Sequence, residues 1–312
     1  MNKKMIKRIL DGAKKLKIIV WGDAMLDVYR HASAVRMCPE APVPTVELSH
    51  STYALGGAAN VAAGIASLGA KTELVACVGA DKHWTLMRNL CDVYGVGTRF
   101  VAVSKRRKTT TKTRFIRGSH IMFRIDDDHK KPWNAVNVLS NAMESFDPNA
   151  LVVSDYAKGA VINNAMMHVY RTDRMALYVS PKPCSDLHLR FADAVLCNRN
   201  EAYELTSWMC QSSDPPSTFA KSIMDVTGVK NVVITMDALG VLVASKGLPP
   251  VNLIQTAVAI GNTCGAGDTF LAAFAVAHKV LGDAIEAAEF GNHCAGLAVQ
   301  HIGTTVVTKD ML

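Results

Sequence analysis

The sequence of 312 residues contains no Cys-x-x-Cys pair, although it has eight cysteines, at positions 38, 77, 91, 184, 197, 210, 264 and 294. Cysteines paired at that spacing are typical of zinc sites and of redox-active dithiols. Their absence argues against both classes of protein. Scattered thiols are typical of a reducing compartment, and we therefore expect a cytoplasmic protein.

Long apolar runs are also missing. No run approaches the ~20 residues that cross a bilayer, and the basic segment 1–17 leads only into the short apolar segment 18–21. We therefore expect neither a signal peptide nor a membrane anchor, and no membrane partner. Hydrophobic residues make up 49% of the chain and charged residues 20%, as in soluble globular proteins. The length is compatible with one large domain that covers residues 1–312.

A glycine followed by a lysine occurs nowhere in the chain. The Walker A loop requires that dipeptide, so nucleotide binding of the P-loop type is excluded. The net charge of +7 raises nucleic acid or a phosphorylated small molecule as a partner. The basic segments 1–17 and 104–118 lack the interleaved aromatic residues of a base-stacking surface, and we expect no nucleic-acid partner. The N-terminal lysines are interpreted as a solvated helix face.

Short apolar segments that end in polar residues or glycine alternate with helical stretches along the chain. The apolar segments are 17–23, 72–81, 150–159, 176–182, 194–201 and 231–240, and an alanine-rich helix is expected over 56–70. Apolar strands that alternate with helices predict an α/β fold, in which a mostly parallel sheet is covered on both faces. Ligands of such a sheet bind beyond the carboxyl ends of its strands.

Two segments, 24–55 and about 98–126, show period-2 patterning with turns that contain proline or glycine. We interpret them as a small β-sheet lid over the ligand edge of the main sheet. Residues 105–108 are expected to form a solvated turn of this lid. Open sheet edges with apolar residues such as Val43, Val46 and Leu48 invite pairing with a second copy, so we expect a homodimer through the lid.

The segment 261–270, GNTCGAGDTF, places Asp268 after a glycine-rich turn and before an apolar helix. Free N–H groups at the start of that helix, in a turn without bulky side chains, can bind a phosphate. A carboxylate at the same place stays ionised and can accept the proton of a hydroxyl, as phosphoryl transfer to an alcohol requires. The alternative is an aspartate that only caps the helix.

Several motifs in this order resemble the ribokinase-like (PfkB) carbohydrate kinases, over almost the whole chain. The motifs are Gly22-Asp23…Asp27, GGAAN (56–60), SDYAKG (154–159), NRNE (198–201) and GAGD (265–268). Within that family, PEAPVP (39–44), the segment 56–70 and SDYAKGA (154–160) are similar to kinases that act on D-glycero-D-manno-heptose 7-phosphate in lipopolysaccharide precursor synthesis. The resemblance implies a ribokinase-like three-layer sandwich with a lid, and an ATP- and Mg²⁺-dependent kinase that phosphorylates the anomeric hydroxyl.

The resemblance also assigns roles to individual residues. Asp268 is expected to be the catalytic base, and the N–H groups of Gly265, Ala266 and Gly267 the anion hole. Positions that bind sugar hydroxyls correspond to Asp23, Asp27, Gly56, Gly57 and Asn60. For Asn60 the alternative is an amide that satisfies only the backbone of its own helix.

On the nucleotide side, Asn198 and Glu201 match an N-x-x-E motif that helps to place Mg²⁺ and the phosphates, with Glu201 acting through water. A surface glutamate is the alternative. Thr235, Gly240 and Asn292 match further positions on the nucleotide side.

A substrate that already carries a phosphate needs cations at the far end of its site. The candidates are Lys112, Arg114, Arg124, Lys158 and Lys182.

The chain departs from the family pattern at several positions. Asn262 stands where aspartate is usual in a loop that contributes to a monovalent-cation site. The sequence therefore leaves open whether the protein requires a monovalent cation. Ser180 also replaces an aspartate, Cys264 replaces a small polar residue, and Asp237 stands where glycine is common. Two-activity relatives continue into a nucleotidyltransferase domain, for which we expect no room because the chain ends at Leu312.

Two alternatives to the heptose 7-phosphate kinase stay open from the sequence. The first is another sugar kinase of the same fold, acting on ribose, a fructose phosphate or a nucleoside. The second is a non-catalytic sensor of sugar phosphate or nucleotide, which Asn262 and Ser180 motivate.

Overall fold

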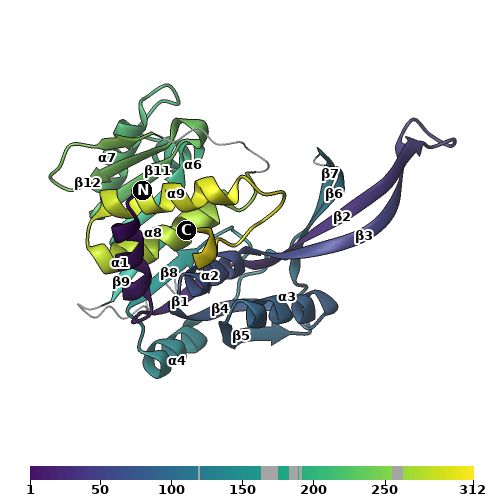
Figure 1. The fold of residues 1–312 in the computed structure, drawn as a ribbon, viewed down its shortest axis with the longest axis horizontal. Coiled ribbons are helices and arrows are strands. Elements are labelled where there is room, and N and C mark those ends of the chain that lie inside the picture. Colours follow the sequence, from purple (N-terminus) through teal and green to yellow (C-terminus); the bar gives the residue numbers. More distant parts are fainter. Residues whose placement is uncertain (119, 163–174, 183–188, 190–191, 255–262) are drawn as a thin grey trace.

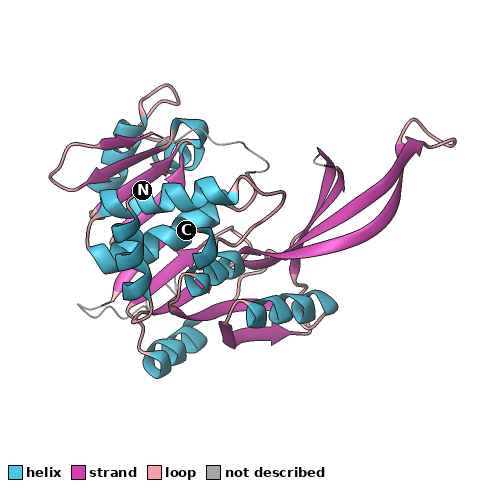
Figure 2. Cartoon of the chain, viewed as in Figure 1, coloured by secondary structure: helices cyan, strands magenta, loops and turns pink. Residues whose placement is uncertain are grey.

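The computed structural model describes residues 1–118, 120–162, 175–182, 189, 192–254 and 263–312. It contains a nine-stranded sheet and a separate four-stranded sheet (Figures 1 and 2). The order of the large sheet is β13-β12-β11-β10-β9-β8-β1-β4-β5. Neighbouring strands in it pair in parallel except for the pairs β11–β12 and β12–β13, which are antiparallel. The predicted α/β class with a mostly parallel sheet is therefore confirmed.

Six of the nine strands of the large sheet, β1, β4, β8, β9, β10 and β11, coincide with the predicted apolar segments, whereas β5, β12 and β13 were not predicted as strands of this sheet. The bounds of the strands are β1 Lys17–Gly22, β4 Lys71–Gly79, β5 Val96–Ser104, β8 Ala150–Ser154, β9 Ala176–Ser180, β10 Ala194–Asn198, β11 Asn231–Thr235, β12 Val241–Ser245 and β13 Val251–Leu253. Most of their residues are buried because both faces of the sheet are covered.

Helices form a layer on each face of this sheet. One core contains side chains from α1 (Lys3–Ala13), α2 (Ala58–Ser67), α3 (Lys82–Val93), α8 (Ala266–Leu281) and α9 (Ala284–Ala298). The other contains side chains from α4 (Val136–Phe146), α6 (Arg199–Thr206) and α7 (Pro216–Thr227). Strand β1 contributes Ile18 and Val20 to the first core and Ile19 and Trp21 to the second, as the period of two requires. No helix in the described ranges is both long and apolar enough to span a bilayer.

Helix α8 is the central helix of its layer, and it carries Asp268 in its first turn. Ten consecutive residues, from Asp268 to Ala277, are buried, as expected for a helix that is apolar on all sides. Small residues let α2 approach it closely, since a Cβ at Gly64 would lie 2.9 Å from the Cβ of Ala272. This packing brings the start of α2, which holds Asn60, next to the start of α8.

The carboxyl ends of the parallel strands lie along one edge of the sheet. Gly22 of β1 pairs with Ser154 of β8, and Ser154 pairs with Ser180 of β9. Farther along the sheet, Asn198 of β10 pairs with Thr235 of β11. The polar residues that follow these strands therefore share one edge, as predicted from the sequence.

The small sheet consists of β2 (Ala24–Met37), β3 (Pro44–Gly57), β6 (Thr110–Arg117) and β7 (His120–Asp127), in the order β3-β2-β6-β7. It extends away from the body of the molecule (Figure 1). The expected lid segment 98–126 was wrong at its start, because residues 98–104 belong to β5, which pairs with β4 in the large sheet. A half-buried edge strand has the same period-2 pattern as a lid strand, so the pattern could not separate the two.

The predicted solvated turn at 105–108 is wrong for one of its residues. Lys105, Arg106 and Lys108 are exposed, but Arg107 is half-buried. Its guanidinium group donates to the carbonyl oxygens of Lys131 (2.9 Å), His129 (3.3 Å) and Lys158 (2.8 Å). Arg107, in the connection from β5 to β6, therefore contacts the connection from β7 to α4 and the loop after β8.

Candidate active site

Asp268 lies at the centre of the candidate site and is 7% exposed. Its Oδ1 accepts a hydrogen bond from the hydroxyl of Tyr156 (2.7 Å), and its Oδ2 accepts one from Nδ2 of Asn60 (3.2 Å). Each carboxylate oxygen can accept two hydrogen bonds, so each keeps one acceptor position for a further donor. The Asn60 amide therefore contacts the predicted base and does not serve only its own helix.

Burial raises the pKa of Asp268 from its ordinary value of 3.8 to about 6. The hydrogen bonds from Tyr156 and Asn60 and the charge of Lys112 act in the opposite direction, while the charge of Asp27 adds to the increase. A carboxyl group with this pKa is mostly ionised at pH 7, and it is a stronger base than an exposed aspartate.

Tyr156 belongs to the loop that follows β8, and Asp23, just after β1, fixes the backbone of that loop. Oδ2 of Asp23 accepts from the N–H groups of Tyr156 (2.8 Å) and Lys158 (3.0 Å), and Oδ1 accepts from that of Ala160 (2.8 Å). Ala157 has a φ of 54°, a conformation that costs most residues about 1–3 kcal/mol. In this structure Asp23 therefore holds the loop, and only its Oδ1 has room for another donor.

Asp27, on β2, forms a buried ion pair with Arg114, on β6, with 2.7 Å between Oδ1 and Nη1. The other oxygen of Asp27 accepts from the hydroxyl of Thr304 (2.6 Å), and the guanidinium of Arg114 also lies 3.0 Å from Sγ of Cys264. Burial alone would lower the pKa of Arg114, but the charge of Asp27 raises it. These contacts join two lid strands to the glycine-rich loop and to the C-terminal segment.

Backbone conformation and close contacts explain why two positions of the site, 57 and 265, need glycine. Gly57 has a φ of 56°, and a Cβ there would lie 2.4 Å from the carbonyl oxygen of Asp23. Gly265, the N-cap of α8, has a φ of 78°, and its Cβ would lie 2.8 Å from Cγ2 of Thr304. Gly56, at the end of β3, pairs with Met25 of β2.

The predicted anion hole lies at the start of α8. The N–H of Ala266 donates to the carbonyl oxygen of Thr263 (3.3 Å). Within the described part of the chain, the N–H groups of Gly265 and Gly267 have no protein acceptor. Two of the three predicted N–H groups therefore have no acceptor among the residues that the structure describes.

The five predicted phosphate-binding cations differ in their surroundings. Lys158 pairs with Asp128, Lys182 with Glu201, Arg114 with Asp27, and the exposed Arg124 with Asp126. Lys112 is the member of the set that has no carboxylate partner among the residues that the structure describes. Its Nζ lies 5.2 Å from the centre of the Tyr156 ring, and Nζ of Lys182 lies 5.4 Å from that centre. Lys112 and Lys182 therefore lie beside the ring whose hydroxyl contacts Asp268.

Asn198 and Glu201 form a capping box at the start of α6. The Asn198 side chain accepts from the N–H of Glu201 (2.9 Å), and the Glu201 carboxylate accepts from the N–H of Asn198 (2.9 Å) and pairs with Lys182. The described residues contain no cluster of three or more His, Cys, Asp or Glu side chains able to hold a metal ion. The single carboxylate of Glu201 still fits a Mg²⁺ site. Proteins usually bind Mg²⁺ through one or two carboxylates, and substrate phosphates and water supply the other ligands.

Thr235, Gly240 and Asn292 are the other predicted nucleotide-side residues, and Thr235 is the register partner of Asn198 on the neighbouring strand. Thr235 ends β11, and Gly240 has a φ of 90° after the short 3₁₀ helix Asp237–Leu239. Asp237 itself has a φ of 49°, which gives a physical reason why glycine is common there. Within the described ranges, no hydrogen bond or ion pair links Thr235, Gly240 or Asn292 to Asp268. The departure at Asn262 lies outside the described residues.

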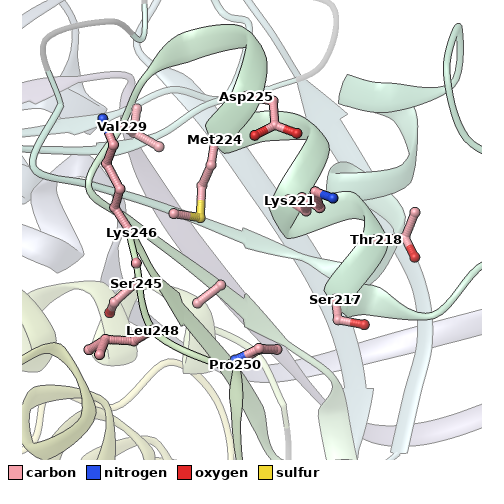
Figure 3. A pocket seen from close by; sticks show the side chains of 12 residues that line it. Ser217, Thr218, Lys221, Met224, Asp225, Val229, Ser245, Lys246, Leu248 and Pro250 are labelled. Carbon is pink, nitrogen blue, oxygen red and sulfur yellow. The ribbon is translucent and has the colours of Figure 1, made fainter.

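Two cavities border the segment 244–254. One of about 710 Å³ lies between α9 and β13, and Asn292 lines it together with His293. Another of about 590 Å³ lies between α7 and the β12–β13 hairpin (Figure 3), with Met224 and Lys246 among its lining residues. None of the predicted site residues lines this second cavity.

Several residues of the site were not predicted from the sequence. Tyr156 lies inside the SDYAKG motif, but the motif predicts no role for its hydroxyl. Thr304 and Tyr29 carried no sequence signal, yet the N–H of Thr304 donates to the hydroxyl of Tyr29 (2.8 Å). Ser180, which replaces a usual aspartate, accepts the N–H of Asp155 with its backbone oxygen (3.1 Å).

Curated relatives match nearly the whole chain. The chain is 34% identical to the bifunctional protein HldE of Caulobacter vibrioides over 303 residues, which cover 95% of the chain and 62% of that relative. It is 31% identical to the bifunctional protein HldE of Coxiella burnetii, over 96% of the chain and 63% of that relative. The chain therefore spans less than two thirds of the length of these relatives.

Solved structures share the fold at low sequence identity. A structure of Arabidopsis thaliana ribokinase complexed with ribose and ATP has a TM-score of 0.73 and 20% identity, and the match covers 93% of this chain and 94% of the other. Phosphofructokinase-2 of Escherichia coli, in complex with substrates and products, has a TM-score of 0.76 and 17% identity, with coverage of 95% and 96%. The fold is thus ribokinase-like.

The family model described as pfkB family carbohydrate kinase matches residues 15–311. It covers the predicted base, the lid and every strand of the large sheet. The chain belongs to the pfkB family of carbohydrate kinases.

Proposed function

We propose that this sugar kinase uses Asp268 as its catalytic base and transfers the γ-phosphoryl group of ATP to the anomeric hydroxyl of D-glycero-D-manno-heptose 7-phosphate. The observation that carries the proposal is a buried carboxylate in the first turn of α8, beside the N–H groups of Gly265 and Gly267, which have no acceptor among the described residues. Burial raises the pKa of this carboxyl to about 6. A base and an anion-binding turn are thereby adjacent, as phosphoryl transfer to an alcohol requires.

In the proposed reaction, the sugar hydroxyl gives its proton to Asp268 while its oxygen forms the new bond to the γ-phosphorus. The bond from that phosphorus to the bridging oxygen of ADP breaks, so the products are the 1,7-bisphosphate and ADP. The N–H groups of Gly265 and Gly267 lie where they could neutralise charge on the transferring group. Lid strands β2 and β6 carry Asp27 and Lys112 toward Asp268, and a lid placed there would exclude water from the phosphoryl group.

Mg²⁺ bound to the nucleotide would neutralise phosphate charge and hold the phosphates in place. Glu201 and Asn198 are the residues of this chain that would orient it, with Glu201 acting through water. Lys182, which pairs with Glu201 and lies beside the Tyr156 ring, would connect this group to Asp268. Asn292 and the cavity between α9 and β13 are proposed for the nucleotide side.

The substrate assignment is supported by sequence and by charge. The segments 39–44 and 154–160 resemble those of heptose 7-phosphate kinases, and the named relatives are HldE proteins. Lys112, which has no carboxylate partner in the described ranges, is a cation available for the phosphate that the sugar already carries. A role in lipopolysaccharide precursor synthesis in the cytoplasm would follow from this substrate.

A coupled assay of ADP release tests the substrate. The panel contains heptose 7-phosphate, fructose 6-phosphate, fructose 1-phosphate, ribose and adenosine. We expect the highest kcat/KM with heptose 7-phosphate. A higher value for another member would assign a different sugar kinase, and binding of sugar and nucleotide without ADP release on any member would indicate a sensor.

We also propose that the lid pairs with the lid of a second copy. Strand β6 pairs with residues 25–31 of β2, so the outer part of β2 and β3 extends as a two-stranded arm, which is only marginally stable alone. Asp27 and Arg114 lie on one face of the lid sheet. The other face carries the side chains of Phe123 and Ile125, which are 41% and 52% exposed. Pairing of two lids would cover both the two-stranded arm and these exposed apolar side chains.

A further inference from the structure

The predicted base receives a hydrogen bond from a side chain for which neither the motifs nor the family resemblance suggested a role. The hydroxyl of Tyr156 donates to Oδ1 of Asp268 at 2.7 Å, the usual length of a well-formed O–H···O hydrogen bond. Burial, and then the nearby charge of Asp268, raise the pKa of Tyr156 well above its ordinary value of 10. The hydroxyl therefore keeps its proton and remains a donor throughout the pH range in which a kinase is assayed.

We propose that Tyr156 is a positioning residue for Asp268, which fixes the orientation of the carboxylate and keeps it ionised for proton transfer from the sugar. This inference rests on the proposed function, because it takes Asp268 as the base. One acceptor position of Oδ1 is held by Tyr156 and one of Oδ2 by Asn60. The carboxylate cannot rotate without losing both bonds, so its free acceptor positions point in fixed directions.

The groups that face Asp268 come from four elements. Asn60 of α2 is neutral, Asp27 of β2 is negative, Lys112 of β6 is positive, and Tyr156 comes from the loop after β8. Burial and Asp27 favour the protonated acid, whereas Tyr156, Asn60 and Lys112 favour the carboxylate. Of the three stabilising groups, Tyr156 makes the shorter of the two direct hydrogen bonds.

The placement of the hydroxyl is built into the loop. Three N–H groups of residues 156–160 converge on the buried carboxylate of Asp23, and they hold Ala157 in its left-handed conformation. Lys112 and Lys182 flank the ring. A side chain held from both its backbone and its ring is preorganised, and it need not reorganise when the sugar binds.

The first test compares Tyr156→Phe with Tyr178→Phe as the matched control. Tyr178 is another buried tyrosine, whose hydroxyl bonds His278 at 2.9 Å and takes no part in the site. The rate of ADP release is measured from pH 5.5 to 8.5 with the panel sugar that the wild type uses best. A rise of about one unit in the pKa of Asp268 would lower kcat at pH 6 about fivefold and at pH 8 hardly at all.

We expect this pH-dependent loss in Tyr156→Phe, with little change in KM for the sugar, and a wild-type pH profile in Tyr178→Phe. A loss in Tyr156→Phe that is equal at all pH values would assign only a structural role and overturn the proposal. So would a wild-type profile in that variant.

The second test needs no turnover. Protein labelled with ¹³C at the aspartate carboxyl carbons is titrated by NMR, and the Asp268 signal is identified by its loss in Asp268→Asn. We expect its apparent pKa to be higher in Tyr156→Phe than in the wild type. An unchanged pKa overturns the inference about Tyr156, whereas failure of every panel sugar would count against the proposed function alone.

Discussion

Arg114 and Asp27 form an ion pair at 2.7 Å between two lid strands, and their side chains are only 6% and 5% exposed. Removing one partner of a buried pair leaves an uncompensated charge, which costs about 3–5 kcal/mol. We therefore expect Asp27→Asn to lower the free energy of unfolding by that amount in urea titrations. The double variant Asp27→Leu with Arg114→Met should lose less, because it leaves no buried charge. Equal losses in both would contradict this explanation.

Asp268→Asn should abolish most turnover while ATP still binds. The amide cannot accept the proton of the sugar hydroxyl, and a general base contributes about 10²–10⁴-fold to the rate. The measurements are kcat by coupled ADP release and the ATP dissociation constant by calorimetry. Asp225→Asn, an exposed position on α7, serves as the control and should match the wild type. Near-normal turnover in Asp268→Asn would remove this residue as the base.

The same variant should be more stable than the wild type at neutral pH. The folded-state pKa of Asp268 is about 6 and its ordinary value is 3.8. Between these values the folded protein keeps a proton that the unfolded chain has lost, so stability falls as the pH rises through this window. Above pH 6 the ionised carboxylate of Asp268 lowers the free energy of unfolding of the wild type by up to roughly 3 kcal/mol.

Urea unfolding of Asp268→Asn and of the wild type at pH 4 and pH 7.5 tests whether the stability of the wild type falls as the pH rises. The advantage of the variant should be several-fold larger at pH 7.5 than at pH 4. A difference that does not change with pH would mean that Asp268 titrates normally in the folded protein. Asp225→Asn is again the control, and we expect no pH-dependent difference from it.

Lys112→Met should weaken the binding of a phosphorylated sugar specifically. Loss of a charged hydrogen bond to the phosphate costs about 1.5–3 kcal/mol, which raises KM roughly tenfold or more. The assay is run at pH 8, where Asp268 is ionised. Lys108→Met is the control, since Lys108 is exposed on the lid side and pairs with Asp127. An equal rise in KM for a sugar without phosphate would argue against a phosphate contact.

Ile125→Lys should produce a monomer if two lids pair. The side chain is 52% exposed on the apolar lid face, and a charge there would have to be buried between two copies. Sedimentation at micromolar concentration gives the mass. Val226→Lys, at a similarly exposed apolar position on α7, should leave the mass unchanged. A wild-type mass equal to one chain would refute the dimer.

The sequence predicted the six central parallel strands of the large sheet, from β4 to β11 in the sheet order, because their signal is local, but it did not predict the edge strands β5, β12 and β13. Each buried strand is a short apolar run, and the polar residue that follows it marks the ligand edge. The position of Asp268 in the first turn of α8 was also readable from the glycines before it and the apolar run after it. The lid boundary was less accurate, since β5 has the pattern of a lid strand.

The hydrogen-bond partners of the site could not be predicted in the same way. Asn60 and Asp268 are 208 residues apart in the chain, and Tyr156 and Asp268 are 112 apart. Such pairs depend on how α2, α8 and the loop after β8 pack, which no local pattern encodes. Residue types were informative only where a motif had already drawn attention to them, as with Asn198 and Glu201.

The loop 155–160 connects parts of the molecule that are otherwise separate. Lys158 pairs with Asp128 at the end of the lid, its carbonyl oxygen accepts from Arg107, and Tyr156 contacts Asp268. A displacement of the lid would therefore be transmitted through Lys158 and Tyr156 to Asp268, the proposed proton acceptor. We expect an enzyme assembled in this way to split little nucleotide while no sugar is bound, which would spare the cell a futile drain on its ATP.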